Sequence, residues 1–124
     1  MPHLTLEYTA NIPAPKDPAQ IMKAMHEVLH EVGGVKIENC KSRIKAADPF
    51  FISRGEESAA FLHLDVRLIE GRTNELKQEI GDGLLDILKQ EYKKEMQTRD
   101  LQITVEIRDI KRHEYFKYPE GTLT

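Results

Sequence analysis

Residues 25–34 read MHEVLHEVGG and contain HEVLH, a match to the H-E-x-x-H pattern of zinc peptidases. In that pattern two histidines one helical turn apart bind the metal, and the glutamate between them is the general base. A catalytic zinc needs a third protein ligand, and the extended pattern would place a histidine where this chain has Lys36. Both His26 and His30 also lie away from the apolar side of the helix expected here. We therefore interpret the motif as a solvated helix face and predict no metal site.

A second candidate for chemistry is the start of the chain, Met1-Pro2. Removal of an initiator methionine that precedes a small residue would leave Pro2 with a free secondary amine. An α-amino group titrates at about 7.7–8.0, and nearby cations and partial burial both lower that pKa. Because Pro2 directly precedes an expected strand, the sheet would hold its nitrogen in place. The sequence thus offers a base for proton transfer at neutral pH. The alternative is that Pro2 is merely a small second residue.

Cationic side chains that could bind an anion occur in two places. Lys41, Arg43 and Lys45 alternate along an expected strand and so share one of its faces. Arg72 precedes Thr73 at the start of an expected helix, where the N-terminal end of the helix favours anions. Arginine can donate two parallel hydrogen bonds to a carboxylate. From the residues alone, Arg72 is equally well a solvated turn residue, and an exposed charged strand face is the favoured interpretation of the lysines.

The first half of the chain is expected to position these residues with a strand, a helix and a second strand. HLTLEY (3–8) alternates apolar and polar residues, which is typical of a half-buried strand. Asp17 followed by proline predicts the start of a helix, and Gly33-Gly34 predicts its end. A second strand is expected near 40–46.

The same order recurs in the second half of the chain. Residues 59–69 read AAFLHLDVRLI and place four apolar residues on one strand face. Thr73 can cap a helix whose apolar stripe runs from Leu76 to Met96, and LQITVEI (101–107) is the fourth strand.

We therefore predict one domain over 1–124, with pseudo-repeats at about 2–58 and 59–108 and a tail over 109–124. Three aromatic residues suggest that the tail docks onto something: Tyr115, Phe116 and Tyr118. Each repeat is a β-α-β unit, which favours parallel pairing of its own two strands. Side by side, the two units predict an α+β fold, a four-stranded, mostly parallel or mixed sheet with both helices on one face. A partner subunit is the economical cover for the other face.

Composition excludes several classes of protein. With 40% hydrophobic and 31% charged residues, the chain is typical of a globular domain. A formal net charge of −3 gives no positive field for nucleic acid or anionic lipid. No apolar run approaches the roughly 20 residues of a membrane span, and the N-terminus lacks the pattern of a signal peptide. The single cysteine, Cys40, excludes an internal disulfide. We predict a cytoplasmic protein that binds neither nucleic acid nor membrane.

Several segments resemble a known family. PHLTLEY at the start, Ser42-Arg43 in the second strand and FLHLDVRLIEGRTNELKQEIGDGLL (61–85) are similar to the 5-carboxymethyl-2-hydroxymuconate isomerases of the tautomerase superfamily. IEGRTNELKQ (69–78) also resembles the strand-to-helix opening of the smaller 4-oxalocrotonate tautomerases. The resemblance extends over nearly the whole chain.

The resemblance implies a tautomerase-like homotrimer with active sites at subunit boundaries and no cofactor. Its substrate would be an unsaturated 2-hydroxy or 2-oxo di- or tricarboxylate from the degradation of homoprotocatechuate-type aromatic acids. Pro2 would be the catalytic acid and base, while Arg72 and Arg43 would bind carboxylates. Family members carry an arginine at or next to the position of Lys41. Lys41 keeps the positive charge but lacks the planar guanidinium fork, which leaves its role in carboxylate binding open. Alternatives are another proline-dependent tautomerase or hydratase, or a non-catalytic trimeric binding protein with this fold.

Overall fold

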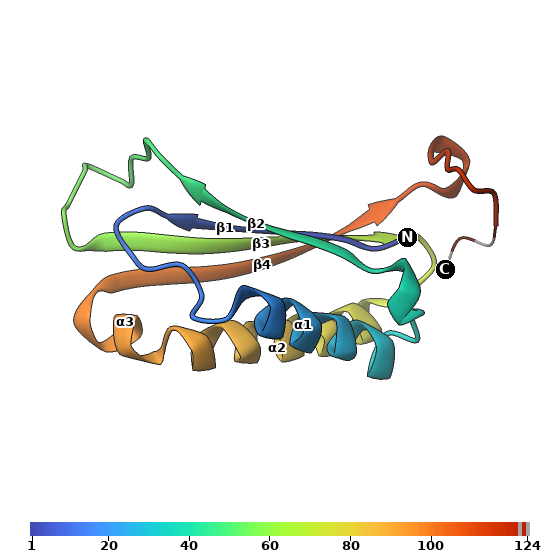
Figure 1. Cartoon of the computed structure of the whole chain (residues 1–124), viewed down its shortest axis with the longest axis horizontal. Helices are drawn as coiled ribbons and strands as arrows, with labels where there is room; N and C mark the ends of the chain where they lie inside the picture. The colour runs from blue at the N-terminus through green and yellow to red at the C-terminus, as the bar shows by residue number, and fades with distance from the viewer. Residues whose placement is uncertain (122, 124) are drawn as a thin grey trace.

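The computed structural model describes residues 1–121 and 123, which form a single sheet covered on one face by helices (Figure 1). In chain order the main elements are β1 (His3–Thr9), α1 (Pro18–Glu31), β2 (Lys41–Ala47), β3 (Ala59–Ile69), α2 (Asn74–Glu91), α3 (Lys93–Thr98) and β4 (Asp100–Ile110). Two short 3-10 turns, η1 (Ile37–Asn39) and η2 (Arg112–Glu114), precede β2 and follow β4.

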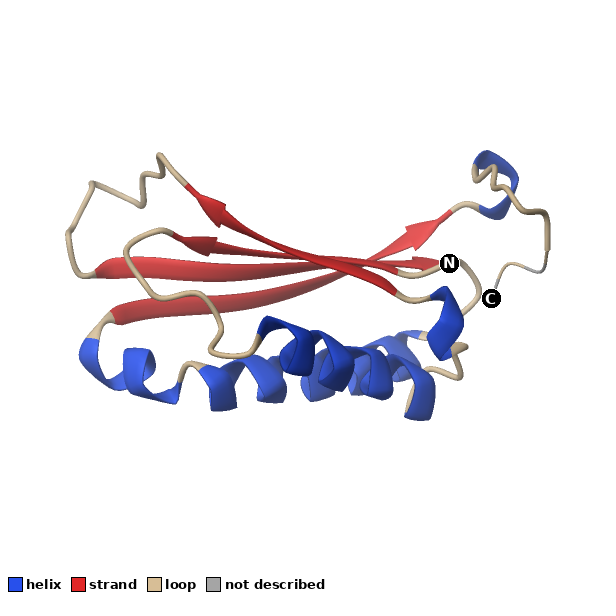
Figure 2. Ribbon diagram, viewed as in Figure 1, coloured by secondary structure: helices blue, strands red, loops and turns tan. Residues whose placement is uncertain are grey.

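The strand order in the sheet is β2-β1-β3-β4. β1 pairs in parallel with β2, and β3 pairs in parallel with β4, while the central pair β1–β3 is antiparallel. Figures 1 and 2 show α1 and α2 side by side on the same face of the sheet. The predicted fold of two β-α-β units in a mixed four-stranded sheet is therefore confirmed.

Local signals position both long helices as the sequence predicts. The Asp17 side chain accepts a hydrogen bond from the Gln20 backbone N–H at 3.1 Å and so caps α1. Thr73 Oγ1 accepts from the Leu76 N–H at 3.2 Å and caps α2 in the same way. After α1, Gly34 has a φ of 70°, a left-handed conformation that favours glycine.

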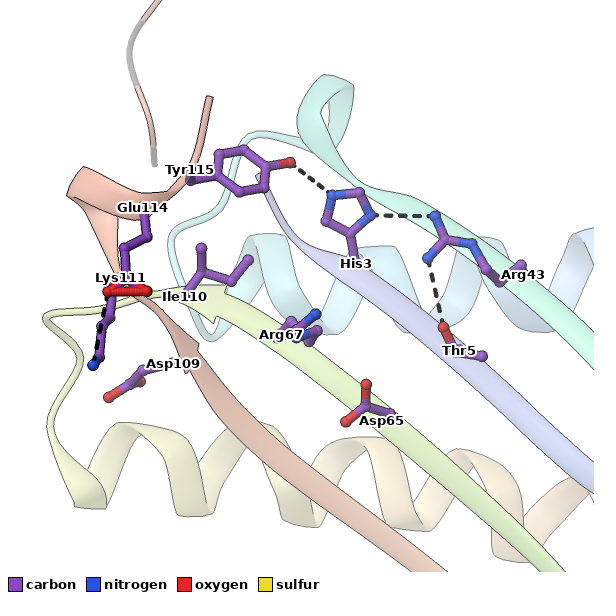
Figure 3. Close-up of a pocket in the computed structure, with 10 residues that line it drawn as sticks. All are labelled: His3, Thr5, Arg43, Asp65, Arg67, Asp109, Ile110, Lys111, Glu114 and Tyr115. Carbon is purple, nitrogen blue, oxygen red and sulfur yellow. Dashed lines mark hydrogen bonds and ion pairs between the residues drawn. The ribbon is translucent and has the colours of Figure 1, made fainter. Parts of the chain in front are cut away.

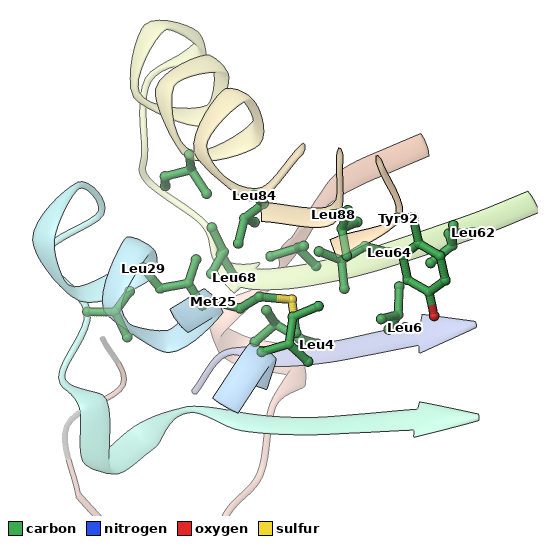
Figure 4. Close-up of a cluster of buried hydrophobic side chains, with 14 of the residues drawn as sticks. Leu4, Leu6, Met25, Leu29, Leu62, Leu64, Leu68, Leu84, Leu88 and Tyr92 are labelled. Carbon is green, nitrogen blue, oxygen red and sulfur yellow. The ribbon is translucent and has the colours of Figure 1, made fainter. Parts of the chain in front are cut away.

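The hydrophobic core lies between the sheet and the two long helices (Figure 4). Alternate residues of β1 and β3 face it, and one stripe of each helix covers them. The side chains at its centre have no more than 1% exposure: Leu4, Leu6, Met25, Leu29, Leu62, Leu64, Val66, Leu68, Ile80, Leu84 and Leu88. Burying one such side chain contributes about 1.5–3 kcal/mol.

Two expectations for the second half need correction. The apolar stripe does not continue to Met96, because α2 ends at Glu91 and the chain bends at Tyr92 (φ −108°, ψ 26°) before α3. Met96 lies on α3 with 42% of its side chain exposed. The fourth strand is longer than LQITVEI and runs to Ile110.

The face of the sheet turned away from the helices, here called the outer face, carries mainly polar side chains. These alternate with the buried residues of each strand. In the part of the chain that the structure describes, no helix is long and apolar enough to cross a bilayer.

Candidate active site

The N-terminal residues extend the parallel pairing of β1 and β2. The Lys41 backbone N–H donates to the Pro2 carbonyl at 3.1 Å, and His3 lies opposite Lys41 in the register. Pro2 is buried, and Met1 is only 8% exposed. The start of the chain is thus held against the end of the sheet, as expected for a residue directly before a strand.

The terminal amine lies in cationic, partly buried surroundings. Its pKa, on Met1, is lowered first by burial and then by the positive charges of Lys41 and Arg72, with a smaller contribution from Lys117. Cys40 acts in the opposite direction. The amine is one residue from the Pro2 nitrogen, and an amine on either residue would meet the same cations.

Arg72 is held by backbone carbonyls from both halves of the molecule. Its Nε donates to Gly33 O at 3.3 Å, just after α1, and its Nη1 donates to Ile69 O at 3.0 Å, at the end of β3. Burial lowers the pKa of Arg72 while Asp109 opposes the change, and an arginine remains charged at any physiological pH. The two contacts orient the guanidinium plane and leave further N–H donors for a ligand.

Arg43 lies on the outer face, on the same side of β2 as Lys41 and one outward-facing position further along. Figure 3 shows its guanidinium directed at His3 and Thr5, with Nη2 at 3.2 Å from His3 Nδ1 and Nη1 at 3.5 Å from Thr5 Oγ1. On the other side of the imidazole, His3 Nε2 lies 2.7 Å from the Tyr115 hydroxyl. Of the predicted site residues, Lys41 and Arg72 carry the positive charges that act on the terminal amine, while Arg43 contacts His3 and Thr5.

The contacts fix the protonation of His3. A guanidinium can only donate, so Nδ1 must accept, and Nε2 carries the hydrogen and donates to the Tyr115 oxygen. Burial, then Arg43 and Lys41, lower the pKa of His3 and keep the ring neutral.

A cavity of about 500 Å³ opens beside His3 on the outer face. Residues from all four strands and from the tail line it, including Arg43, Arg67 and Tyr115 (Figure 3). The predicted docking of the tail is confirmed for Tyr115. Phe116 and Tyr118 do not dock within this chain, since they are 89% and 95% exposed, and their docking onto a partner stays a prediction. Sequence reasoning missed the role of His3, and only its position next to Pro2 signals it.

The HEVLH histidines both use a ring nitrogen on a protein partner. His26 Nε2 forms a hydrogen bond with Ser42 Oγ of β2, and His30 Nδ1 lies 2.8 Å from Val35 O. His26 is half-buried, so a solvated helix face is the wrong description for it. The helix–sheet packing explains the difference, because this side of α1 faces the edge strand β2.

A cluster on the outer face brings together three side chains that could bind a metal, His63, Asp65 and Glu106, with ligand atoms within 4.8 Å of one another. Both oxygens of Asp65 are already engaged by Arg108, at 2.8 and 3.0 Å. His63 Nδ1 is 2.7 Å from Thr104 Oγ1. The cluster is therefore an ion-paired surface group.

The model of the 5-carboxymethyl-2-hydroxymuconate isomerase family matches residues 2–120. The chain belongs to this family. An Escherichia coli relative, a 5-carboxymethyl-2-hydroxymuconate Delta-isomerase, is 25% identical over 110 residues, which cover 89% of this chain and 87% of the relative. The crystal structure of a 5-carboxymethyl-2-hydroxymuconate isomerase from Deinococcus radiodurans R1 is 30% identical, with a TM-score of 0.85 over 94% of this chain and 87% of that one.

A fused 4-OT symmetric trimer shares the fold at 23% identity, with a TM-score of 0.72 over 98% of this chain and 94% of that one. The protein is thus an isomerase with the tautomerase-like α+β fold. In this isomerase the fold positions the start of β1, the start of β2 and the turn before α2 around one point, the N-terminal amine.

Proposed function

We propose that this isomerase shifts a carbon–carbon double bond in an unsaturated 2-hydroxy or 2-oxo polycarboxylate of the 5-carboxymethyl-2-hydroxymuconate type, with Pro2 as acid and base and without a cofactor. The observation that carries the proposal is the partly buried terminal amine beside Lys41 and Arg72, which both lower its pKa. Removal of Met1 would expose the Pro2 nitrogen among the same cations. Burial and these cations would lower the pKa of a secondary amine there and so favour the neutral form, which can accept a proton.

The proposed reaction moves one proton and one double bond. The Pro2 nitrogen takes the proton from the 2-hydroxyl of the dienol, and the electron pair moves through the conjugated carbons to give a dienolate. The protonated Pro2 nitrogen then returns the proton to a carbon further along the chain, which leaves a 2-oxo acid and restores the neutral amine. Proton donor and acceptor are the same group, so the reaction consumes no co-reactant.

The cations are proposed to bind the substrate and to stabilise the dienolate. Arg72 is oriented by Gly33 O and Ile69 O and would donate to the carboxylate beside the reacting oxygen. Lys41 would act as a point charge, since it lacks the fork of arginine. Arg43, held by His3 and Thr5, would meet a more distant carboxylate.

We further propose that the protein assembles as a homotrimer through the outer face. Support comes from the fold shared with a protein described as a symmetric trimer. Large aromatic side chains at both ends of the molecule, Phe51 and Phe116, are 77% and 89% exposed, as expected of side chains that a neighbouring copy covers.

The test is an ultraviolet assay of 5-carboxymethyl-2-hydroxymuconate isomerisation, with a chelator present and with the N-terminal mass of each preparation verified. Protein that begins at Pro2 should turn over rapidly. Protein that retains Met1 should be inactive, because its Pro2 nitrogen is a tertiary amide without a basic lone pair. Equal rates for the two forms would contradict the proposal, as would loss of activity on chelation.

A further inference from the structure

The carboxylates that line the cavity beside His3 are already paired. Asp65 accepts two hydrogen bonds from Arg108, and Asp109 lies 2.9 Å from Lys77 Nζ. The third, Glu114, lies within 4 Å of both Lys111 and His113. None of these acids is therefore left over to balance a further cation in the cavity.

Two guanidinium groups of the cavity have no such partner. Arg43 donates to the neutral His3 ring and to the Thr5 hydroxyl, neither of which carries a negative charge. Arg67 is exposed and forms no ion pair within residues 1–121 and 123. Three cations and three carboxylates line the cavity, but Asp65 and Asp109 pair with Arg108 and Lys77, which do not line it. Arg43 and Arg67 are thus left without a balancing carboxylate in a protein whose net charge is −3.

The strand register places Lys41 and Arg67 in one row with His3, and Arg43 lies opposite Thr5 in the next outward-facing position. Lys41 on β2 and Arg67 on β3 lie directly opposite His3 on β1, on either side of it. Neighbouring strands are about 4.8 Å apart, so the row spans about 10 Å. It lies one residue from Pro2, within the length of a small polycarboxylate.

Tyr115 adds a hydrogen-bond donor to the same cavity. Its oxygen accepts from His3 Nε2, which leaves its own hydrogen available for an anion. The cavity of about 500 Å³ falls within the range of about 300–1,000 Å³ typical of small-molecule sites. A single carboxylate with its methylene arm fits in that space.

We infer that this cavity binds the third carboxylate of a tricarboxylate substrate, with Arg67 and Tyr115 as the residues that recognise it. The inference rests on the proposed function and adds the basis of selectivity between tricarboxylates and dicarboxylates. Arg67 contributes the planar fork, and Tyr115 the neutral donor.

The test compares kcat and KM of Arg67→Gln on two substrates, 5-carboxymethyl-2-hydroxymuconate and the same compound without its carboxymethyl arm. For the tricarboxylate, KM should rise at least about tenfold with little change in kcat, because the contact is made equally in the ground and transition states. For the dicarboxylate, neither constant should change. Tyr115→Phe should show the same pattern with a smaller rise, about two- to tenfold, as expected for one neutral hydrogen bond.

The matched control is Arg54→Gln, which removes an exposed arginine from the β2–β3 loop at the opposite end of the sheet (Figure 1). It should change neither substrate's constants. An equal loss on both substrates in Arg67→Gln would overturn the inference. So would unchanged kinetics together with a smaller particle mass, which would show that Arg67 binds an acidic side chain of a second copy.

A binding measurement separates this inference from the proposed chemistry. Calorimetric titration of Pro2→Ala protein with tricarballylate and glutarate requires no turnover. Tighter binding of the tricarboxylate, abolished by Arg67→Gln, would support the site even if the isomerase assay failed. Equal binding of both acids would overturn the inference and leave the role of Pro2 unaffected.

Discussion

The two β-α-β halves follow the same path but treat the charges of the outer face differently. In the second half, Asp65 is bound by Arg108, and His63 lies beside Thr104 and Glu106. In the first half, Lys41 and Arg43 form no ion pair within the described residues and contact only neutral groups. The half that begins with Pro2 therefore carries two cations without an ion pair, and the second half adds Arg67.

The halves also differ in length. β1 and β2 have 7 residues each, whereas β3 and β4 have 11, and α2 has 18 residues against 14 in α1. The longer half supplies more of the sheet pairing. On its outer face Asp65 and Arg108 balance each other, while Arg67 forms no ion pair within the described residues. Unpaired cations occur in both halves, with Lys41 and Arg43 in the shorter one and Arg67 in the longer one. They cost little at an exposed position yet are what an anionic substrate needs. The first repeat thus contributes the proposed base, and the two repeats share the cations that would bind the substrate.

The strongest test of this division is to change the residue that precedes the first strand of each half. Pro2 precedes β1, and Ser58 precedes β3. We expect Pro2→Ala to lower kcat by at least about 10²-fold, since general acid–base catalysis contributes roughly 10²–10⁴-fold and alanine leaves a primary, more mobile amine. Ser58→Ala should retain wild-type kinetics.

Steady-state assays on preparations of verified N-terminal mass check this result. A Pro2→Ala enzyme within twofold of wild type would show that the two strand starts are equivalent, and that the chemistry lies elsewhere.

The second comparison concerns the arginines of the second half. Arg72 donates to two carbonyls and its charge lowers the pKa of the terminal amine, whereas Arg108 is bound to Asp65. We expect Arg72→Lys to lower kcat/KM about 10–100-fold, because an ammonium cannot hold both carbonyls and a carboxylate in one plane, and a charge-assisted hydrogen bond is worth about 1.5–3 kcal/mol. Arg108→Lys should change kcat/KM less than twofold.

Thermal melts of both variants serve as the control, since Arg72 also joins the end of α1 to the end of β3. Similar losses in the two arginine variants would remove the distinction between a site arginine and a structural one.

Short-range signals in the sequence were sufficient to predict most of the fold. Alternation of apolar residues marks β1 and β3, and the caps at Asp17 and Thr73 fix the starts of α1 and α2. The β-α-β order then fixes parallel pairing within each half. For the candidate site, the sequence predicts the residue types and the shared strand face of Lys41 and Arg43. The shared face can be predicted because the period-two alternation of a strand is a local property.

Contacts between distant segments could not be predicted in this way. Tyr115 meets His3 across 112 residues, and no local pattern links them. The pairing of His26 with Ser42 depends on how α1 lies over the edge strand β2, which periodicity does not specify. Met96 follows the helical spacing of α2 but lies beyond the bend at Tyr92.

A third comparison uses two lysines of β2 that share one face. Lys41 lowers the pKa of the terminal amine, whereas Lys45 lies four residues further along the strand. The base is active when neutral, so kcat/KM rises as pH increases through the amine pKa. Lys41→Met removes a positive charge, raises that pKa and should move the acidic limb of the profile to higher pH. Lys45→Met should leave the limb in place.

The pH profile of kcat/KM reports the free enzyme and so measures this shift directly. A limb that stays fixed in Lys41→Met would show that Lys41 does not act on the reacting amine, whatever its effect on KM.

The smallest expected effect is on the pH dependence of stability. It concerns the polar contacts that join the helix of each half to a strand. In the first half His26 of α1 meets Ser42, and in the second Lys77 of α2 meets Asp109 at 2.9 Å. Burial lowers the pKa of His26 below its ordinary 6.5. The unfolded chain therefore binds a proton more readily, so stability is complete above about pH 6.5 and is lost as the pH falls through the folded-state pKa.

Urea denaturation at pH 5.5 and pH 7.5 measures this difference. The free energy of unfolding of the wild type should be lower at pH 5.5 by less than about 1 kcal/mol, because His26 is only half-buried and solvent screens its charge. His26→Gln should reduce that difference. Lys77→Met removes a pair without a histidine and should lower stability equally at both pH values, leaving the difference intact. A pH dependence unchanged in His26→Gln would assign it to another histidine, with His3, whose pKa is lowered by burial and by Arg43, as the next to substitute.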